Sequence, residues 1–139
     1  MNILGVDPGV TTGLCVCRCK LQQGGGRSIH PHCFAQVKLS PELVSELYMF
    51  IISEHIELIV MESIVQSGYL SKEKVSQIRA HDRVLCLAER RRITLEEVQP
   101  QAVKQITEVP REVQGNHARD AYRVVAAYLR KHGETVGNR

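Results

Sequence analysis

The chain has 139 residues, the length of one typical domain, and 43% of them are apolar, which is enough to build a buried core. The formal net charge is only +3, so an acidic polymer would have to be bound by local basic patches and not by the overall charge. No apolar run approaches the roughly 18 residues of a membrane span and the N-terminus lacks the layout of a secretion signal, so we expect a cytoplasmic protein with no membrane segment.

The first third of the chain predicts three strands joined by short connections. Residues 2–7 form an apolar run that ends at an Asp-Pro-Gly turn, and residues 12–20 form a second run with alternating character. A loop at 21–28 that contains three consecutive glycines leads to a third strand at 32–39. Strands connected in this way favour an antiparallel meander, in which the second strand lies beside the first.

Five cysteines, an odd number without a secretion signal, indicate reduced thiols. Cys15, Cys17 and Cys19 alternate along the second predicted strand, so their side chains share one face of it. We predict that they are small core residues. A structural zinc site with the nearby His30 and His32 is the alternative, which the absence of any CxxC pair disfavours.

The remainder of the chain alternates between helices and strands. Ser40 followed by Pro41 is typical of a helix start, and Ser71 is a similar start for a second, longer helix. The strand between these helices is continuously apolar, which predicts burial on both faces and a parallel neighbour reached through a helical crossover. The expected elements are a helix from 41, a strand at 57–62, a helix at 71–91, a strand at 93–98, a short helix at 100–107 and a last helix from about 116.

This order predicts an α/β fold with a five-stranded mixed sheet, whose first three strands are antiparallel, flanked by helices. We expect one domain over residues 1–132 and a polar C-terminal tail at 133–139. No internal repeat and no second domain are indicated by the sequence.

Three acids and a histidine stand at the ends of apolar segments in distant parts of the chain. Asp7 closes the first predicted strand, Glu62 closes the fourth, and His117 and Asp120 lie one turn apart at the start of the last helix. Neighbouring strands lie about 4.8 Å apart, so Asp7 and Glu62 could approach one ion at the carboxyl ends of parallel strands. Oxygen-rich ligation favours Mg²⁺ or Mn²⁺, and two such ions suit phosphodiester hydrolysis. Taken singly, each acid has a structural alternative as a turn residue, a strand-end charge or a first-turn helix acid.

Three segments resemble the motifs of RuvC Holliday-junction resolvases, which are members of the RNase H-like superfamily. Residues 3–13 resemble the opening strand and turn, residues 60–63 the second acidic motif, and residues 117–121 the last motif, in which a His or Asp precedes the final acid by three positions. The resemblance spans nearly the whole chain. The chain passes quickly from 105 to 116, where cellular members carry an extra basic segment, which makes it similar to a compact bacteriophage-type version.

This resemblance implies a metal-dependent, structure-selective DNA endonuclease of recombination and repair. It implies a homodimer, with the helix at 72–90 in the interface, that nicks paired strands of four-way or other branched DNA. Two Mg²⁺ ions per site are implied, with Mn²⁺ able to substitute. The implied catalytic and metal-binding residues are Asp7, Glu62, His117 and Asp120.

Basic residues in the second half of the chain are candidates for phosphate contacts. On the helix predicted at 71–91, three of them recur 7 and 4 residues apart and so fall on one line along its surface. Two others lie near the acids in sequence, and one aromatic could stack on exposed bases. Their structural alternatives are a solvated helix face and an ordinary loop aromatic. The candidates are Lys72, Arg79, Arg83, Lys104, Arg119 and Tyr69.

Two other functions stay open at the level of sequence. An RNA-processing nuclease of the YqgF type shares the fold and an early Asp-x-Gly motif, and a non-catalytic RNase H-like module could bind branched DNA without cutting it. The spacing of His117 and Asp120 favours the RuvC type over the first alternative. The presence of all the expected acids disfavours the second.

Overall fold

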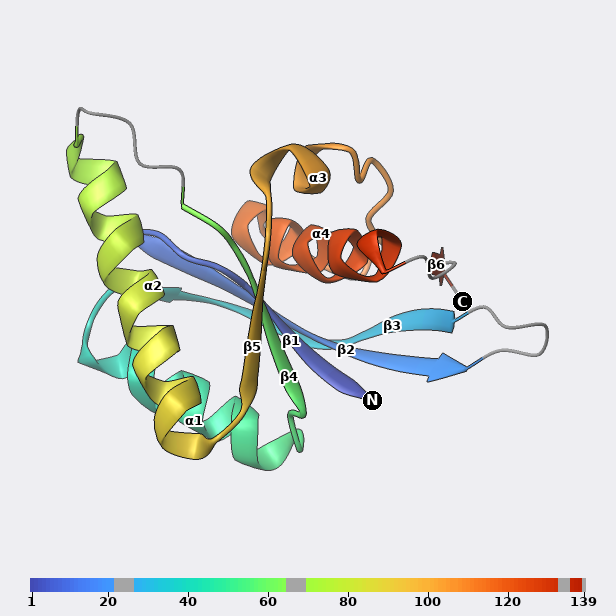
Figure 1. Ribbon diagram of the computed structural model, residues 1–139, viewed down its shortest axis with the longest axis horizontal. Helices are drawn as coiled ribbons and strands as arrows, with labels where there is room; N and C mark the ends of the chain where they lie inside the picture. Colours follow the sequence, from blue (N-terminus) through green and yellow to red (C-terminus); the bar gives the residue numbers. More distant parts are fainter. Residues whose placement is uncertain (22–26, 65–69, 133–135, 139) are drawn as a thin grey trace.

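A mixed β-sheet lies between two layers of helices in the computed structural model of the protein (Figure 1). The structure describes residues 1–21, 27–64, 70–132 and 136–138. The strands are β1 (Asn2–Asp7), β2 (Thr11–Leu21), β3 (Arg27–Lys38), β4 (Leu58–Glu62), β5 (Thr94–Val98) and β6 (Val136–Asn138). The helices are α1 (Pro41–Ser53), α2 (Lys72–Arg91), α3 (Pro100–Lys104) and α4 (Asn116–Lys131).

The strand order is β5-β4-β1-β2-β3-β6. β1 pairs with β2 and β2 with β3 in antiparallel fashion, whereas β4 runs parallel to β1 and β5 runs parallel to β4. This confirms the predicted sheet of five strands, including the parallel contact between the first and fourth strands. Ser71 is confirmed as the N-cap of α2, where its hydroxyl oxygen accepts a hydrogen bond from the Lys74 backbone N–H at 3.1 Å.

The outer edge of the sheet differs from the sequence prediction. β3 begins at Arg27 and not near residue 32, because its pairing with β2 continues past Pro31 with a shift in register between Val16 and Cys17. Such irregularities are where a sheet accommodates proline. The tail predicted to be polar and unpaired contains β6, a short strand that runs parallel to the start of β3. β6 covers backbone groups that an edge strand would otherwise leave unpaired.

Two apolar cores lie on opposite faces of the sheet. One core packs α1 and α2 against side chains such as Leu4 and Val16, and the other packs α4 against the opposite face. Cys15, Cys17 and Cys19 are buried in the second core, as predicted for small core residues. Within the described parts of the chain, no helix is both long and apolar enough to cross a membrane.

Candidate active site

The ends of β1 and β4 place Asp7 and Glu62 at equivalent positions of neighbouring strands. The parallel register pairs Val6 with Met61, so the next residue of each strand is one of the two acids. Asp7 is the more enclosed of the two, with 14% of its side chain exposed, and Glu62 is partly buried. The sequence prediction that the two acids meet at one edge of the sheet therefore holds in the structure.

Helix α4 brings His117 to the same edge. The His117 Nδ1 atom lies 3.3 Å from the Asp7 Oδ2 atom, although 110 residues separate the two along the chain. Asp120 follows one turn later on the same helix. The three elements that meet here are those predicted from the spacing of the acids.

Two glycines allow α4 to lie this close to the sheet. A Cβ atom on Gly13 would fall 1.9 Å from the His117 carbonyl oxygen, and one on Gly5 would fall 2.2 Å from the Ala121 carbonyl oxygen. Any side chain at either position would displace the backbone of the helix, because the clashing atoms are carbonyls and not flexible side-chain ends. Gly5 and Gly13 are therefore positioning residues of the site, which the sequence analysis did not identify.

The N-terminus of α4 is capped by a side chain from β3. The N-cap residue is Gly115, with φ of 94°, and it has no side chain to satisfy the first backbone N–H groups. The Gln36 Oε1 atom takes this role by accepting hydrogen bonds from the His117 N–H at 2.8 Å and the Ala118 N–H at 3.4 Å. The sequence separation of 81 between Gln36 and His117 hides this cap from any local sequence pattern.

Burial and mutual repulsion shape the electrostatics of the acids. Burial raises the pKa of Asp7 to about 6, aided by the negative charges of Asp120 and Glu62 and opposed by the hydrogen bond with His117. The pKa of Glu62 is also raised, first by burial and then by the charge of Asp120. Asp120 thus acts on both other acids, which shows that the three carboxylates share one electrostatic environment.

The donor set of this cluster fits a divalent cation. Three carboxylates and an imidazole are suited to Mg²⁺ or Mn²⁺, and a cation would relieve the repulsion that raises the pKa of Asp7 and of Glu62. Among the described residues, however, no three His, Cys, Asp or Glu side chains are already gathered as a metal cage. One reason is local, since the Asp120 carboxylate is turned to Arg123, whose Nη1 atom lies 2.6 Å from Oδ1. To bind an ion, Asp120 would have to turn from Arg123 or share its carboxylate between Arg123 and the ion.

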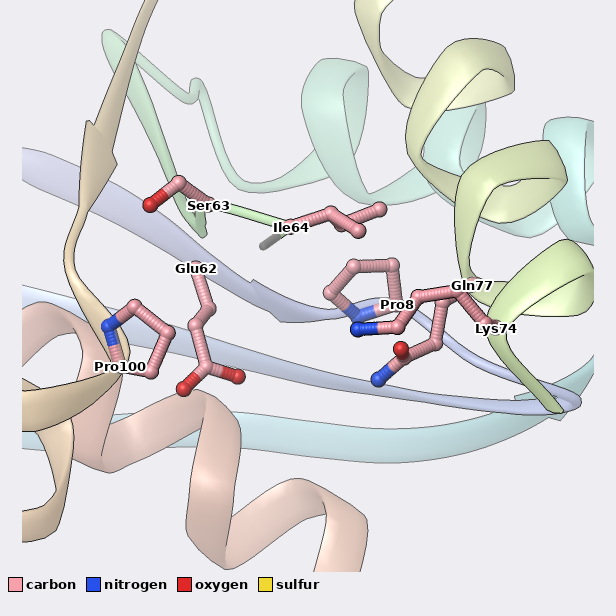
Figure 2. A pocket seen from close by; sticks show the side chains of 7 residues that line it. All are labelled: Pro8, Glu62, Ser63, Ile64, Lys74, Gln77 and Pro100. Carbon is pink, nitrogen blue, oxygen red and sulfur yellow. The ribbon is translucent and has the colours of Figure 1, made fainter. Parts of the chain in front are cut away.

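A cleft with two lobes runs over the carboxylates. The lobe of about 330 Å³ contains Asp7 and His117, and the lobe of about 260 Å³ contains Glu62 (Figure 2). Both lobes are also lined by Pro8 from the turn after β1 and by Lys74 and Gln77 from the first turns of α2. Figure 2 shows Lys74 and Gln77 reaching from α2 to the neighbourhood of Pro8.

Lys74 and Gln77 are not among the residues predicted from the sequence. The predicted basic residues lie on the opposite side of α2, but the helical spacing carries a signal for these two. Positions 74 and 77 fall on the side of α2 that continues through Ala80 and Val84, both of which are buried. Polar residues at the N-terminal end of an otherwise buried helix face indicate that the helix extends beyond the sheet there, over a site.

The predicted phosphate contacts fall into different environments. Lys72, Arg79 and Lys104 are exposed, and Lys104 lies near enough to Glu62 for its charge to lower the pKa of that acid. Tyr69 lies outside the residues that the structure describes.

Two predicted arginines also form contacts within the protein. The Arg83 guanidinium donates a hydrogen bond to the Ser40 carbonyl at 3.4 Å. The Arg119 guanidinium donates to the carbonyls of Pro110 and Val113 at 3.3 and 3.1 Å, and so holds the loop that precedes α4. Arg119 therefore has a structural role in addition to any contact with DNA.

The order of the strands, with acids at the ends of β1 and β4, defines an RNase H-like fold. Neither a protein-family model nor a curated protein matches the chain in sequence. Solved structures match it in fold. RuvC of Thermus thermophilus is 18% identical, with a TM-score of 0.72 over 96% of this chain and 97% of that chain.

One viral structure and one yeast structure are also similar in fold. The fowlpox virus Holliday junction resolvase is 8% identical, with a TM-score of 0.61 over 94% of this chain and 99% of that chain. The yeast mitochondrial Holliday junction resolvase is 13% identical, with a TM-score of 0.58 over 94% of this chain and 78% of that chain. The fold is thus the one shared by RuvC and other Holliday junction resolvases, as the sequence motifs predicted.

Proposed function

We propose that this protein is a metal-dependent, structure-selective DNA endonuclease that resolves Holliday junctions, and other branched DNA, by paired strand nicks. One observation carries the proposal: Asp7, Glu62 and the His117–Asp120 turn come from three distant elements and meet at one edge of the sheet. A structural role for each acid alone does not explain why three carboxylates repel one another there, at a cost that burial increases.

The residues of the site have separable roles in this proposal. Asp7, Glu62, His117 and Asp120 would hold two divalent ions, Mg²⁺ or Mn²⁺, which supply Lewis acidity for phosphodiester hydrolysis. His117 Nδ1 faces Asp7, and this contact orients the ring and leaves Nε2 either to bind one of the ions or to hold or release a proton at the reacting oxygen. With 46% of its side chain exposed, His117 can exchange that proton with water.

The choice of substrate rests on the resolvases of similar fold. Structures of Thermus thermophilus RuvC and of the fowlpox virus resolvase are complexes with Holliday junction DNA. Two opposed nicks need two sites, so the proposal includes a homodimer with α2 in its interface. Among the residues of the site that the structure describes, none favours RNA over branched DNA or binding without cleavage.

Cleavage of labelled four-way, three-way, flap and linear duplex DNA tests the proposal, with Mg²⁺, Mn²⁺ or EDTA. We expect paired, symmetric nicks in the four-way junction, only with a divalent ion, from a protein whose mass in solution is that of a dimer. Similar rates on flaps and three-way branches would indicate a broader debranching nuclease. If none of these DNAs is cleaved with either ion, the proposal is refuted, and structured RNA is the next substrate to test.

A further inference from the structure

The first turns of α2 form a wall of the cleft that faces the acids. Lys74 and Gln77 are three residues apart, which places them on the same side of the helix. Both residues, together with Pro8, line the lobe that holds Asp7 and the lobe that holds Glu62. They therefore stand where the two lobes adjoin.

The charge of Lys74 acts on one acid of the cluster. The ammonium group lowers the pKa of Glu62, against the larger effects of burial and of the Asp120 charge, which raise it. A fixed positive charge beside a cation site opposes binding of the cation, because like charges repel. A negatively charged ligand between the ammonium and the ions would turn this repulsion into attraction on both sides.

We propose that Lys74 and Gln77 bind the phosphodiester group that is cut, with the Lys74 ammonium donating a hydrogen bond to a non-bridging phosphate oxygen. This inference rests on the proposed function and names the residues that seat the DNA strand in the cleft. Lys74 supplies a charge-assisted hydrogen bond and the Gln77 side-chain amide supplies a neutral one. Each lobe is small for a ligand pocket, which suits one stretch of a single backbone in the cleft.

This role differs from that of the line of basic residues on α2. Lys72 and Arg79 are exposed on the side of the helix that turns away from the core. A phosphate contact there adds affinity without touching the reaction. Lys74 lines the same lobes as Asp7 and Glu62, so the loss of its charge is expected to change the rate of cleavage more than the affinity for the junction.

The test compares Lys74→Met, Lys74→Arg and the control Lys131→Met, which removes an exposed lysine near the far end of α4. Single-turnover cleavage of a four-way junction, junction affinity measured with Ca²⁺, Mn²⁺ affinity and thermal unfolding are measured for each. Lys74→Met is expected to slow cleavage by roughly tenfold or more, with junction affinity within about threefold of wild type. Lys74→Arg is expected to recover most of the rate, since it keeps the charge.

The Mn²⁺ affinity separates a phosphate contact from a structural role. Lys74→Met should bind Mn²⁺ as well as or better than wild type, because a repelling charge is removed. Weakened Mn²⁺ binding, cleavage within twofold of Lys131→Met, or no recovery with Lys74→Arg would each overturn the inference. Failure of the wild-type protein to cut any branched DNA would instead refute the proposed function itself.

Discussion

Two helices border the site, and they are attached to the sheet in different ways. α4 lies against glycines of β1 and β2 so closely that no side chain fits between, and a side chain from β3 caps its first turn. α2 has its buried residues from Ala80 onward, and its first two turns stand over the cleft partly exposed. The helix that carries proposed metal ligands is therefore fixed by backbone contacts, and the helix that carries proposed phosphate contacts is not.

This difference follows from what each group has to do. A metal ligand must be held within about half an ångström of its working position, so its helix needs close packing and a fixed end. A lysine that meets a phosphate acts through charge on a long side chain, and its position can vary by more. Substitutions on the α4 side should therefore damage the site more than substitutions on the α2 side.

The largest effect is expected from Asp7→Asn, which tests the acids that α4 completes. Loss of one metal-binding carboxylate should lower the rate of cleavage by roughly a thousandfold or more, which corresponds to about 4 kcal/mol of lost transition-state stabilisation. Junction binding should be kept or improved, because a negative charge beside phosphate is removed. The matched control is Asp82→Asn, at an exposed position of α2. Normal cleavage by Asp7→Asn would show that the assignment of the site is wrong.

Gly13→Ala tests the close approach of α4 to the sheet. The added Cβ would fall 1.9 Å from the His117 carbonyl oxygen, so the helix must move or the strand must bend. We expect a loss of about 1–3 kcal/mol in the free energy of unfolding and at least a tenfold loss of cleavage, since His117 and Asp120 move with the helix. Gly9→Ala is the milder comparison for stability, because its Cβ would lie 3.3 Å from the Thr11 carbonyl oxygen and would need a shift of only a few tenths of an ångström. Equal stability of the two variants would contradict the close packing described for α4.

Asp7 and Gly13 also show what could and could not be predicted from the sequence. The continuously apolar segment that ends in Glu62, reached through a helical crossover, indicated a strand parallel to the one that ends in Asp7. The cost of carboxylates at the ends of core strands indicated a shared cation site. The residue pattern predicted the five strands and the start of α2 on the same local grounds. Gly13 and Gln36 act on the site through contacts with residues far along the chain. The role of Lys74 depends on where the sheet ends beneath α2. No periodicity within one segment encodes contacts of that kind.

Burial of Asp7, aided by the charge of Asp120 on α4, gives a pH dependence. The pKa of Asp7 is raised from 3.8 to about 6, so the folded protein holds this proton more tightly than the unfolded chain does. The contribution of Asp7 to the stability of the metal-free protein should therefore fall as the pH rises from about 4 to about 6. Asp7→Asn should remove this slope and be more stable than wild type at pH 8 in EDTA, as measured by thermal unfolding. An unchanged slope would show that Asp120 and burial do not act on Asp7 as described.

The same proton should control metal binding. Mn²⁺ affinity, measured by calorimetry, should weaken below about pH 6 as Asp7 becomes protonated. Above that pH, added Mn²⁺ should raise the unfolding temperature, because the ion binds only the folded protein. An affinity that does not change between pH 5 and pH 8 would mean that Asp7 is not a ligand.

The smallest effect is expected from Gln36, which separates the capping of α4 from its packing. Gln36→Leu leaves the first N–H groups of α4 without their acceptor and should cost about 1 kcal/mol in the free energy of unfolding. Gln36→Glu keeps an acceptor and adds a negative charge at a helix N-terminus, where the helix dipole favours it, so it should remain close to wild type in stability. Gln101→Leu, at an exposed position of α3, is the matched control.

If the cap also positions His117, then Gln36→Leu should lower the cleavage rate by more than its stability loss explains, at a temperature where the variant is fully folded. The structural reason is that His117 supplies both the N–H group that Gln36 accepts and the ring that meets Asp7. Fraying of this single turn would loosen the ring without unfolding the rest of the helix, which stays packed through Ala121 and Tyr122. A wild-type cleavage rate in the folded Gln36→Leu variant would show that the close contact with Gly13 is enough to position α4. Gln36 would then contribute only to stability.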